Sequence, residues 1–124
     1  MLYTEILKDN RVFQGLYKKG RYTASKFSVI YIRPNGRPFN RFGITAGKKI
    51  GNAVCRNRAK RLIRLAYREN EVNMPVGMDI VIVARSRLCE VKSQEYCAYM
   101  SRYGVSEINK LFKSFGKPEF RKNK

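Results

Sequence analysis

The segment from Asn52 to Asn70 constrains the fold more than any other part of this chain, because its apolar residues recur at helical spacing. At about 100° per residue, these side chains fall within about a third of the helix circumference. They are Cys55, Ala59, Leu62, Ile63 and Ala66. Asn52 is a suitable N-cap, and residues 70–75, which end in proline, break the pattern. The sequence therefore predicts one long amphipathic helix with one face on a core.

The opposite side of this helix is cationic, and no Asp or Glu stands four residues away to relieve the repulsion. A charged face that is merely solvated is the alternative. However, residues 10–68 contain 16 Lys and Arg and no Asp or Glu, and the net charge of the chain is +18. We therefore expect nucleic acid as the partner of this face, with an anionic membrane as the lesser alternative. The face comprises Arg56, Asn57, Lys60, Arg61, Arg64 and Arg68, with Arg58 at its margin.

Two lysines extend the basic surface beyond the helix. Lys48 and Lys49 lie in a tight loop between Gly47 and Gly51. Backbone N–H groups at a helix start bind anions. We therefore expect Lys48, Lys49 and Asn52 to form a second phosphate site beside the cationic face.

The remaining segments predict a single mixed α/β domain. Asp9 or Asn10 caps a short helix that ends at Gly20, and residues 25–33 alternate as a strand does. The turn residues 34–36 predict a hairpin with a second strand at 41–47. Residues 78–85 are almost all apolar, which is typical of a central strand buried on both faces.

A last helix is expected from about Ser93, and its inward stripe contains Cys97, Met100, Gly104, Ile108, Leu111 and Phe115. We favour one continuous helix, although Gly104 could divide it in two. Residues 117–124 form a basic tail that we expect to fray. The chain of 124 residues has no internal repeat or linker, so one domain spanning residues 1–124 is predicted.

Aromatic residues outside the basic helix suggest a second binding surface. Phe13 and Tyr17 are one turn apart on the first helix, and Val29 and Tyr31 share a face of the first strand. Rings beside a groove stack with unpaired bases. Core packing is the alternative for Phe13 and Val29, whereas tyrosine hydroxyls favour a partly wet site. A register shift of one residue would replace Tyr31 with Ile30 in this groove.

The sequence lacks the residues that several classes of function require. The chain has no His, no closely spaced carboxylate pair, no phosphate-binding glycine loop and no zinc-ligand spacing, so we expect no catalytic residue and no metal site in it. The three cysteines, Cys55, Cys89 and Cys97, suggest neither a disulfide framework nor a metal pair, and each is expected as a small, buried or half-buried residue. No signal peptide or membrane-spanning segment is predicted, which indicates a cytoplasmic protein.

The stretch FGITAGKKIGNAVCRNRAKRLIRLAYRE resembles the signature of the bacterial ribonuclease P protein subunit. The shared elements are Gly47, the lysine pair, Gly51-Asn52-Ala53 and the Arg-Asn-Arg-x-Lys-Arg-x-x-Arg helix. Phe13-Gln14, Gly20, the predicted hairpin from Tyr31 to Gly43 and the strand ending at Ala84-Arg85 are also similar. The resemblance spans residues 10–85, and a generic basic helix would not share the flanking GKKIGNA.

The resemblance implies an α+β sandwich like the second domain of a small-subunit ribosomal protein, with three helices, a sheet of about four strands and a left-handed βαβ crossover. Residues 22–24 are the candidate for the fourth strand. It also implies that the protein binds a catalytic RNA, and that the pair removes the 5′ leader from precursor tRNA with Mg²⁺ held mainly by the RNA. The basic helix would face the catalytic RNA, and Phe13, Tyr17 and Tyr31 would line the leader cleft. No membrane and no protein partner are implied.

Two other classes compete with this interpretation. A structural RNA-binding protein such as a ribosomal component, or a DNA-binding protein without sequence preference, would also be basic. All three bind nucleic acid with a steep dependence on salt, because each neutralised phosphate releases counterions. The combination of an aromatic groove with GKKIGNA favours the ribonuclease P subunit.

Overall fold

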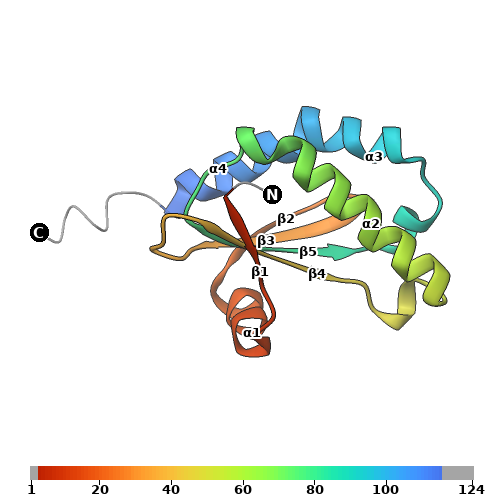
Figure 1. Ribbon diagram of the computed structural model, residues 1–124, viewed down its shortest axis with the longest axis horizontal. Helices are drawn as coiled ribbons and strands as arrows, with labels where there is room; N and C mark the ends of the chain where they lie inside the picture. The colour runs from red at the N-terminus through yellow and green to blue at the C-terminus, as the bar shows by residue number, and fades with distance from the viewer. Residues whose placement is uncertain (1–2, 116–124) are drawn as a thin grey trace, which may run out of the picture.

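The computed structural model describes residues 3–115, which form a five-stranded sheet with helices on both faces (Figure 1). The strands are β1 (Thr4–Ile6), β2 (Arg21–Ala24), β3 (Ser28–Pro34), β4 (Asn40–Thr45) and β5 (Met78–Ala84). The α-helices are α1 (Asn10–Lys19), α2 (Ala53–Asn70), α3 (Ser93–Tyr99) and α4 (Val105–Phe115). Three short 3₁₀ turns, η1 (Lys48–Ile50), η2 (Glu71–Asn73) and η3 (Ser86–Cys89), and a π-helical turn, η4 (Met100–Gly104), complete the fold. The predicted basic tail lies outside the described residues.

The strand order is β1-β4-β5-β3-β2, with β5 at the centre as its apolar sequence predicted. β5 runs antiparallel to β3 and parallel to β4. The predicted hairpin between residues 25–33 and 41–47 is therefore wrong. The turn at residues 34–36 is present, but β5, the most apolar strand, separates β3 from β4 because both of its faces need cover.

The sheet has five strands instead of about four. β2, the candidate fourth strand, pairs antiparallel with β3, and β1 adds a three-residue edge that pairs parallel with β4. β3 begins at Ser28 rather than Ser25, because the Ser25 hydroxyl accepts hydrogen bonds from the backbone N–H groups of Phe27 and Ser28, both at 3.2 Å, in a tight turn. The connection from β4 through α2 to β5 is the expected βαβ crossover. Its left hand and the likeness to a ribosomal protein domain stay predictions.

The helix boundaries follow the predicted caps. Asp9 accepts from the backbone N–H of Arg11 at 2.9 Å, and Asn52 accepts from that of Cys55 at 2.9 Å. The last helix starts at Ser93 and continues through η4 to Phe115. The helix widens into a π turn at η4 instead of dividing at Gly104. Gly104 leaves room there for Met100, since a Cβ on Gly104 would lie 2.5 Å from the Met100 sulfur.

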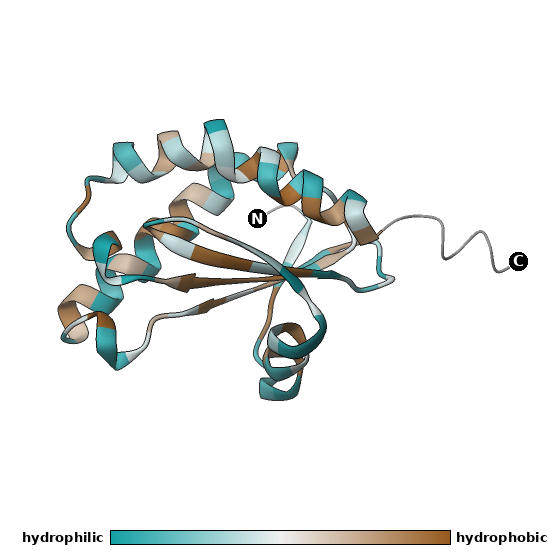
Figure 2. Cartoon of the chain, turned by 180° about the vertical axis from the view of Figure 1, so that it is seen from behind, coloured by the Kyte–Doolittle hydropathy of each residue, from teal (hydrophilic) through white to brown (hydrophobic). Residues whose placement is uncertain are grey.

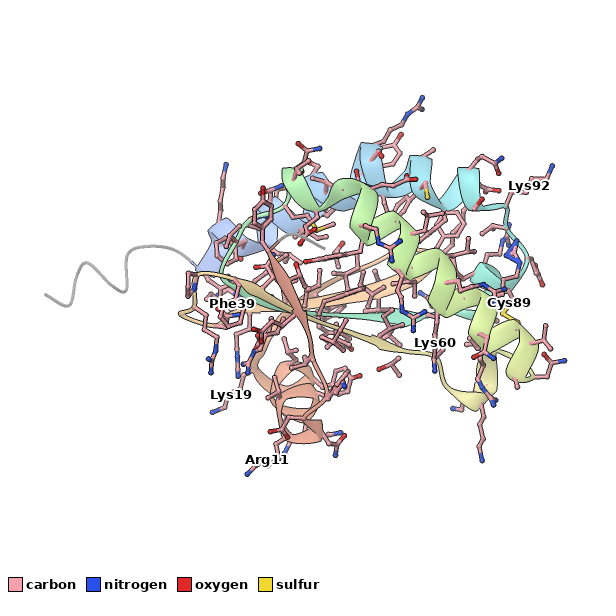
Figure 3. All side chains as sticks on the ribbon, viewed as in Figure 1. Arg11, Lys19, Phe39, Lys60, Cys89 and Lys92 are labelled. Carbon is pink, nitrogen blue, oxygen red and sulfur yellow. A yellow bond between two sulfur atoms is a disulfide. The ribbon has the colours of Figure 1, made fainter. Side chains whose placement is uncertain are left out.

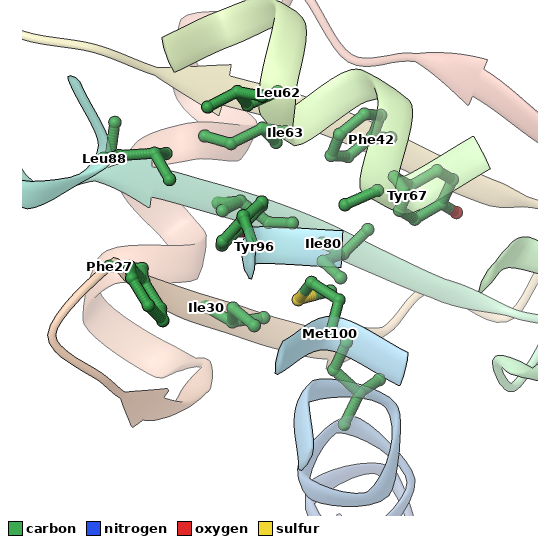
Figure 4. Packing of buried hydrophobic residues seen from close by; sticks show 14 of the residues in the cluster. Phe27, Ile30, Phe42, Leu62, Ile63, Tyr67, Ile80, Leu88, Tyr96 and Met100 are labelled. Atoms are coloured by element: carbon green, nitrogen blue, oxygen red, sulfur yellow. The ribbon is translucent and has the colours of Figure 1, made fainter. Parts of the chain in front are cut away.

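The main core lies between the sheet and the layer formed by α2, α3 and α4 (Figure 4). Apolar residues concentrate on the strands, whereas apolar and hydrophilic residues alternate along the helices (Figure 2). In this layer Phe42 of β4 stacks on Tyr67 of α2 with ring centroids 4.1 Å apart. The predicted inward residues of α2 are buried except Cys55, which is half-buried.

Polar groups buried at the starts of β4 and β5 tie these strands together. The Asn40 side-chain oxygen accepts from the backbone N–H groups of Gly77 and Met78 at 2.7 and 2.9 Å. Arg41 donates two hydrogen bonds to the buried Asp79 carboxylate, at 2.7 and 2.8 Å. These contacts fix the register of β4 against β5.

The cysteine prediction needs one correction. Cys55 and Cys89 are joined by a disulfide, visible beside the Cys89 label in Figure 3. The fold places their Cα atoms 5.4 Å apart although 34 residues separate them in sequence, so their spacing alone carried no signal. Cys97 is free and half-buried, as predicted, and burial raises the pKa of its thiol.

Candidate nucleic-acid interface

Helix α1 crosses one face of the sheet and covers only part of it. In Figure 1 α1 is seen nearly end-on beneath strands that run across the picture. Leu16 of α1 packs with Leu7 and with Val81 of β5, and Val81 is completely buried. The next row on this face is open, and we call it the groove floor: its members are Thr45, Val83, Val29 and Ala24, which are cross-strand neighbours on β4, β5, β3 and β2. The first three are half-buried and the last is exposed, so a strip of sheet beside α1 is accessible.

Phe13 anchors the end of this groove nearest β4. Its ring lies so close to Gly43 that a Cβ on that glycine would sit 2.5 Å from the ring. Phe13 borders two adjoining hollows, one of about 440 Å³ and one of about 160 Å³. The first is lined by Asn10, Phe13, Gln14, Tyr17, Ile44, Thr45, Ala46 and Lys60. The second is lined by Ile6, Leu7, Phe13, Phe42, Gly43, Ile44, Lys60 and Arg64.

Tyr17 connects the two sides of the groove. Its hydroxyl lies 3.0 Å from the Thr45 hydroxyl on β4, and its ring meets Tyr31 of β3 edge to face, with centroids 5.0 Å apart. Ile30 points to the opposite face and is fully buried in the main core. The structure thus settles the register in favour of Tyr31 and brings Phe13, Tyr17, Val29 and Tyr31 to one side of the sheet.

The cationic face of α2 presents three arginines to solvent. Arg61, Arg64 and Arg68 are exposed and border a shallow hollow of about 450 Å³. Within residues 3–115, no ion pair joins a cation of α2 to a carboxylate; the three ion pairs found there are Arg11–Asp9, Arg41–Asp79 and Lys110–Glu107. Phosphate oxygens, which Arg accepts two at a time, are therefore suitable partners for this face.

Three of the predicted RNA-binding residues near the start of α2 also have internal contacts. Arg58 donates to the Val91 carbonyl at 2.6 Å, and Arg56 donates to the Gly51 carbonyl at 3.1 Å. The side-chain oxygen of Asn52 caps the helix. Arg56 and Arg58 are half-buried, whereas Asn52 and Asn57 are exposed. Lys48 and Lys49 are exposed in η1, immediately before this helix start.

Lys60 joins the two surfaces. It belongs to the cationic face of α2 and also lines both hollows beside Phe13. Figure 3 shows its side chain pointing from α2 toward the side of the sheet that carries α1. The cationic face and the aromatic groove therefore form one continuous surface, which the sequence had placed on two separate faces.

The groove also contains residues that the sequence did not indicate. Ile44, Thr45 and Ala46 of the β4 end supply its second wall. These three residues lie within the strand predicted at 41–47. They were not predicted as part of the groove because the wrong hairpin placed that strand beside β3. The lining of both hollows offers rings, hydroxyls, amides and basic groups, and no carboxylate. This set suits binding of an anionic, aromatic strand rather than proton transfer.

Two negative findings apply to residues 3–115. No helix there combines the length and apolar character needed to cross a bilayer. The same residues contain no group of three or more His, Cys, Asp or Glu side chains close enough to hold a metal ion.

Sequence comparisons match this chain to one family over most of its length. The family described as Ribonuclease P matches residues 1–114. The ribonuclease P protein component of Alkaliphilus metalliredigens is 44% identical over 89 residues, which are 72% of this chain and 80% of the relative. That of Lachnoclostridium phytofermentans is 46% identical over 83 residues, which are 67% of this chain and 72% of the relative.

Solved structures of RNase P proteins superimpose on this chain. The RNase P protein of Staphylococcus aureus superimposes with a TM-score of 0.74 at 32% identity, covering 86% of this chain and 96% of that protein. The RNase P protein of Thermotoga maritima gives a TM-score of 0.71 at 31% identity, covering 78% and 92%. The similarity thus includes the α+β domain that carries the groove and the cationic face.

Proposed function

The chain belongs to the ribonuclease P family, and from this premise we propose how it works as the protein component of that enzyme. The cationic face of α2, with Lys48 and Lys49, binds the RNA subunit. The groove beside α1 binds the 5′ leader of precursor tRNA as an unpaired strand. The complex then removes the leader to give the mature 5′ end of the tRNA.

The position of Lys60 carries this proposal. A protein that holds a structured RNA and a single strand at once needs a phosphate-binding face and a stacking groove that meet. Lys60 lies on both, and Arg64 borders the groove one helical turn further along. A strand in the groove would therefore pass directly beside the RNA bound to α2.

The groove itself is suited to single strands. Its rings come from α1 and β3, and its floor is a row of small or β-branched side chains. Unpaired bases stack on rings without regard to sequence, as a protein that processes many different leaders requires. Tyr17 is held in place by Thr45 and Tyr31, so little side-chain entropy is lost when a base stacks on it.

The protein's part in the reaction is binding and positioning. We propose that Mg²⁺ is held by the RNA, where it would activate water and stabilise charge on the phosphate. The lining of the groove contains no carboxylate, and Mg²⁺ prefers carboxylate and phosphate oxygens, so the RNA is the more suitable host. The cations of α2 neutralise phosphates of the complex and so reduce the Mg²⁺ that the RNA needs.

The test is reconstitution. The chain is mixed with a bacterial ribonuclease P RNA, and cleavage of precursor tRNA is measured at low Mg²⁺. We expect cleavage at the mature 5′ end with the chain and little cleavage without it. Arg61→Glu with Arg64→Glu should abolish assembly, whereas Arg102→Glu with Lys113→Glu, which changes two exposed cations of the outer helical layer, should not. Cleavage unaffected by the chain would contradict the proposal.

A further inference from the structure

A third tyrosine extends the ring pair of the groove to the edge of the sheet. Tyr22 of β2 is the cross-strand partner of Tyr31, so both side chains lie on the same face. Their ring centroids are 5.5 Å apart at an interplanar angle of 37°, and Tyr31 in turn contacts Tyr17. Tyr17, Tyr31 and Tyr22 thus form a row from α1 across β3 to the outermost strand, which we call the tyrosine row.

Nothing in the fold requires an exposed ring at Tyr22. The side chain is 60% exposed, and its hydroxyl has no hydrogen-bond partner within residues 3–115. A cross-strand pair with Tyr31 stabilises the sheet only weakly. The neighbouring Arg21 points to the other face, where it donates to Ser114 and lies over the Phe115 ring. Helix α4 therefore covers the opposite side of β2 and leaves the Tyr22 side open.

The surroundings of the tyrosine row favour an anionic strand. All of α1, β2, β3 and β4 come from the part of the chain without Asp or Glu. At the β2–β3 turn, Arg85 donates to the Ser25 carbonyl at 3.0 Å, and Lys26 and Arg85 share a hollow with Arg87 and Glu90. Three cations and one carboxylate therefore line this hollow beside Ser25, which directly follows Ala24 at the end of the groove floor, so the local charge is net positive.

The dimensions fit a short stretch of nucleotides. From β4 to β2 the groove crosses three strand spacings of about 4.8 Å, or about 14 Å in all. A stacked strand advances about 3.4 Å per nucleotide, so about four nucleotides cover this distance. Phe13, Tyr17 and Tyr31 occupy the part near α1, and Tyr22 lies at the far end.

We propose that Tyr22 is a stacking site for an additional unpaired base of the leader, at the outer end of the groove. This inference rests on the proposed function, since it takes the leader strand as the ligand of the groove. Its consequence is a dependence on leader length. A leader too short to cross the sheet does not reach Tyr22, and a leader long enough to cross it gains one more stacked base.

The experiment uses the complex assembled with a ribonuclease P RNA and precursor tRNAs with leaders of one to eight nucleotides. Tyr22→Ala should weaken binding of the longer leaders about fivefold, the lower limit of base–aromatic stacking because the ring is largely exposed. It should leave the shortest leaders and mature tRNA unchanged. Tyr22→Phe keeps the ring and should behave as the original chain. Tyr103→Ala, which removes a ring that is 59% exposed on η4, is the matched control and should have no effect.

A spectroscopic readout separates stacking from a structural effect. A 2-aminopurine placed at each leader position in turn should be quenched at one distal position by the original chain and by Tyr22→Phe, and not by Tyr22→Ala. Equal loss of affinity at every leader length, or no loss at any, would overturn the Tyr22 site. If the original complex itself binds precursor and mature tRNA equally, the proposed function fails as well, so the two failures are distinguishable.

Discussion

Neutralising Arg61 and Arg64 should change how RNA binding depends on salt, and the size of the change follows from the structure. Both guanidinium groups are exposed, and neither forms an ion pair within residues 3–115. If each binds one phosphate, each contributes about 0.9 to the slope of log K against log salt. The double variant Arg61→Gln with Arg64→Gln should therefore make this negative slope shallower by about 1.8. When the salt concentration rises from 50 to 200 mM, the ratio of the binding constant of the original chain to that of the variant should then fall about twelvefold.

The assay is fluorescence anisotropy of labelled ribonuclease P RNA titrated with protein at several KCl concentrations and constant Mg²⁺. The matched control is Arg102→Gln with Lys113→Gln, which removes the same charge from exposed positions on η4 and α4. This control should keep the original slope, because a contact that is not made releases no counterions. An unchanged slope for the Arg61 and Arg64 variant, or an equal decrease for the control, would refute the assignment of phosphates to α2.

Three further predictions test the groove and the core. Tyr17→Ala with Tyr31→Ala should weaken binding of precursor tRNA by the assembled complex and leave mature tRNA unaffected, because only the precursor has a strand to stack; equal loss for both would remove the leader assignment. Asp79→Asn should lower the free energy of unfolding by about 2–3 kcal/mol in urea, less than for a fully buried pair because Arg41 reaches solvent. A loss below 0.5 kcal/mol would contradict this estimate. Burial raises the pKa of Tyr96 above the value of about 10 in the unfolded chain, so its contribution to stability is complete below pH 10 and is lost as pH rises further. Tyr96→Phe should therefore flatten the fall in stability above pH 10, measured by urea unfolding at several pH values.

Local signals in the sequence were sufficient for most helices and for the central strand. The caps Asp9 and Asn52, the apolar stripe of α2 and the continuous apolar run of β5 each depend on residues close together in the chain. Such patterns are visible without knowledge of the fold. The prediction of one continuous last helix was also correct, and Gly104 lies in a π turn within it.

Pairings between distant segments were not predictable in the same way. The turn at residues 34–36 is a local signal, but the choice of β5 as the partner of both β3 and β4 depends on burying its two apolar faces. β1 has only three residues, too few for a periodic pattern to show. The disulfide between Cys55 and Cys89 needed the contact of α2 with η3, and the wall of the groove at Thr45 needed the true neighbours of β4.

The most direct test of a single surface with two RNA-binding parts is photo-crosslinking followed by mass spectrometry of the assembled complex. With 4-thiouridine in the leader of precursor tRNA, crosslinks should fall on peptides of α1 and β3 that contain Tyr17 and Tyr31. With 4-thiouridine in the RNA subunit, they should fall on the α2 peptides around Arg61 and Arg64. Crosslinks from either RNA that fall instead on the outer face of α3 and α4 would contradict the account.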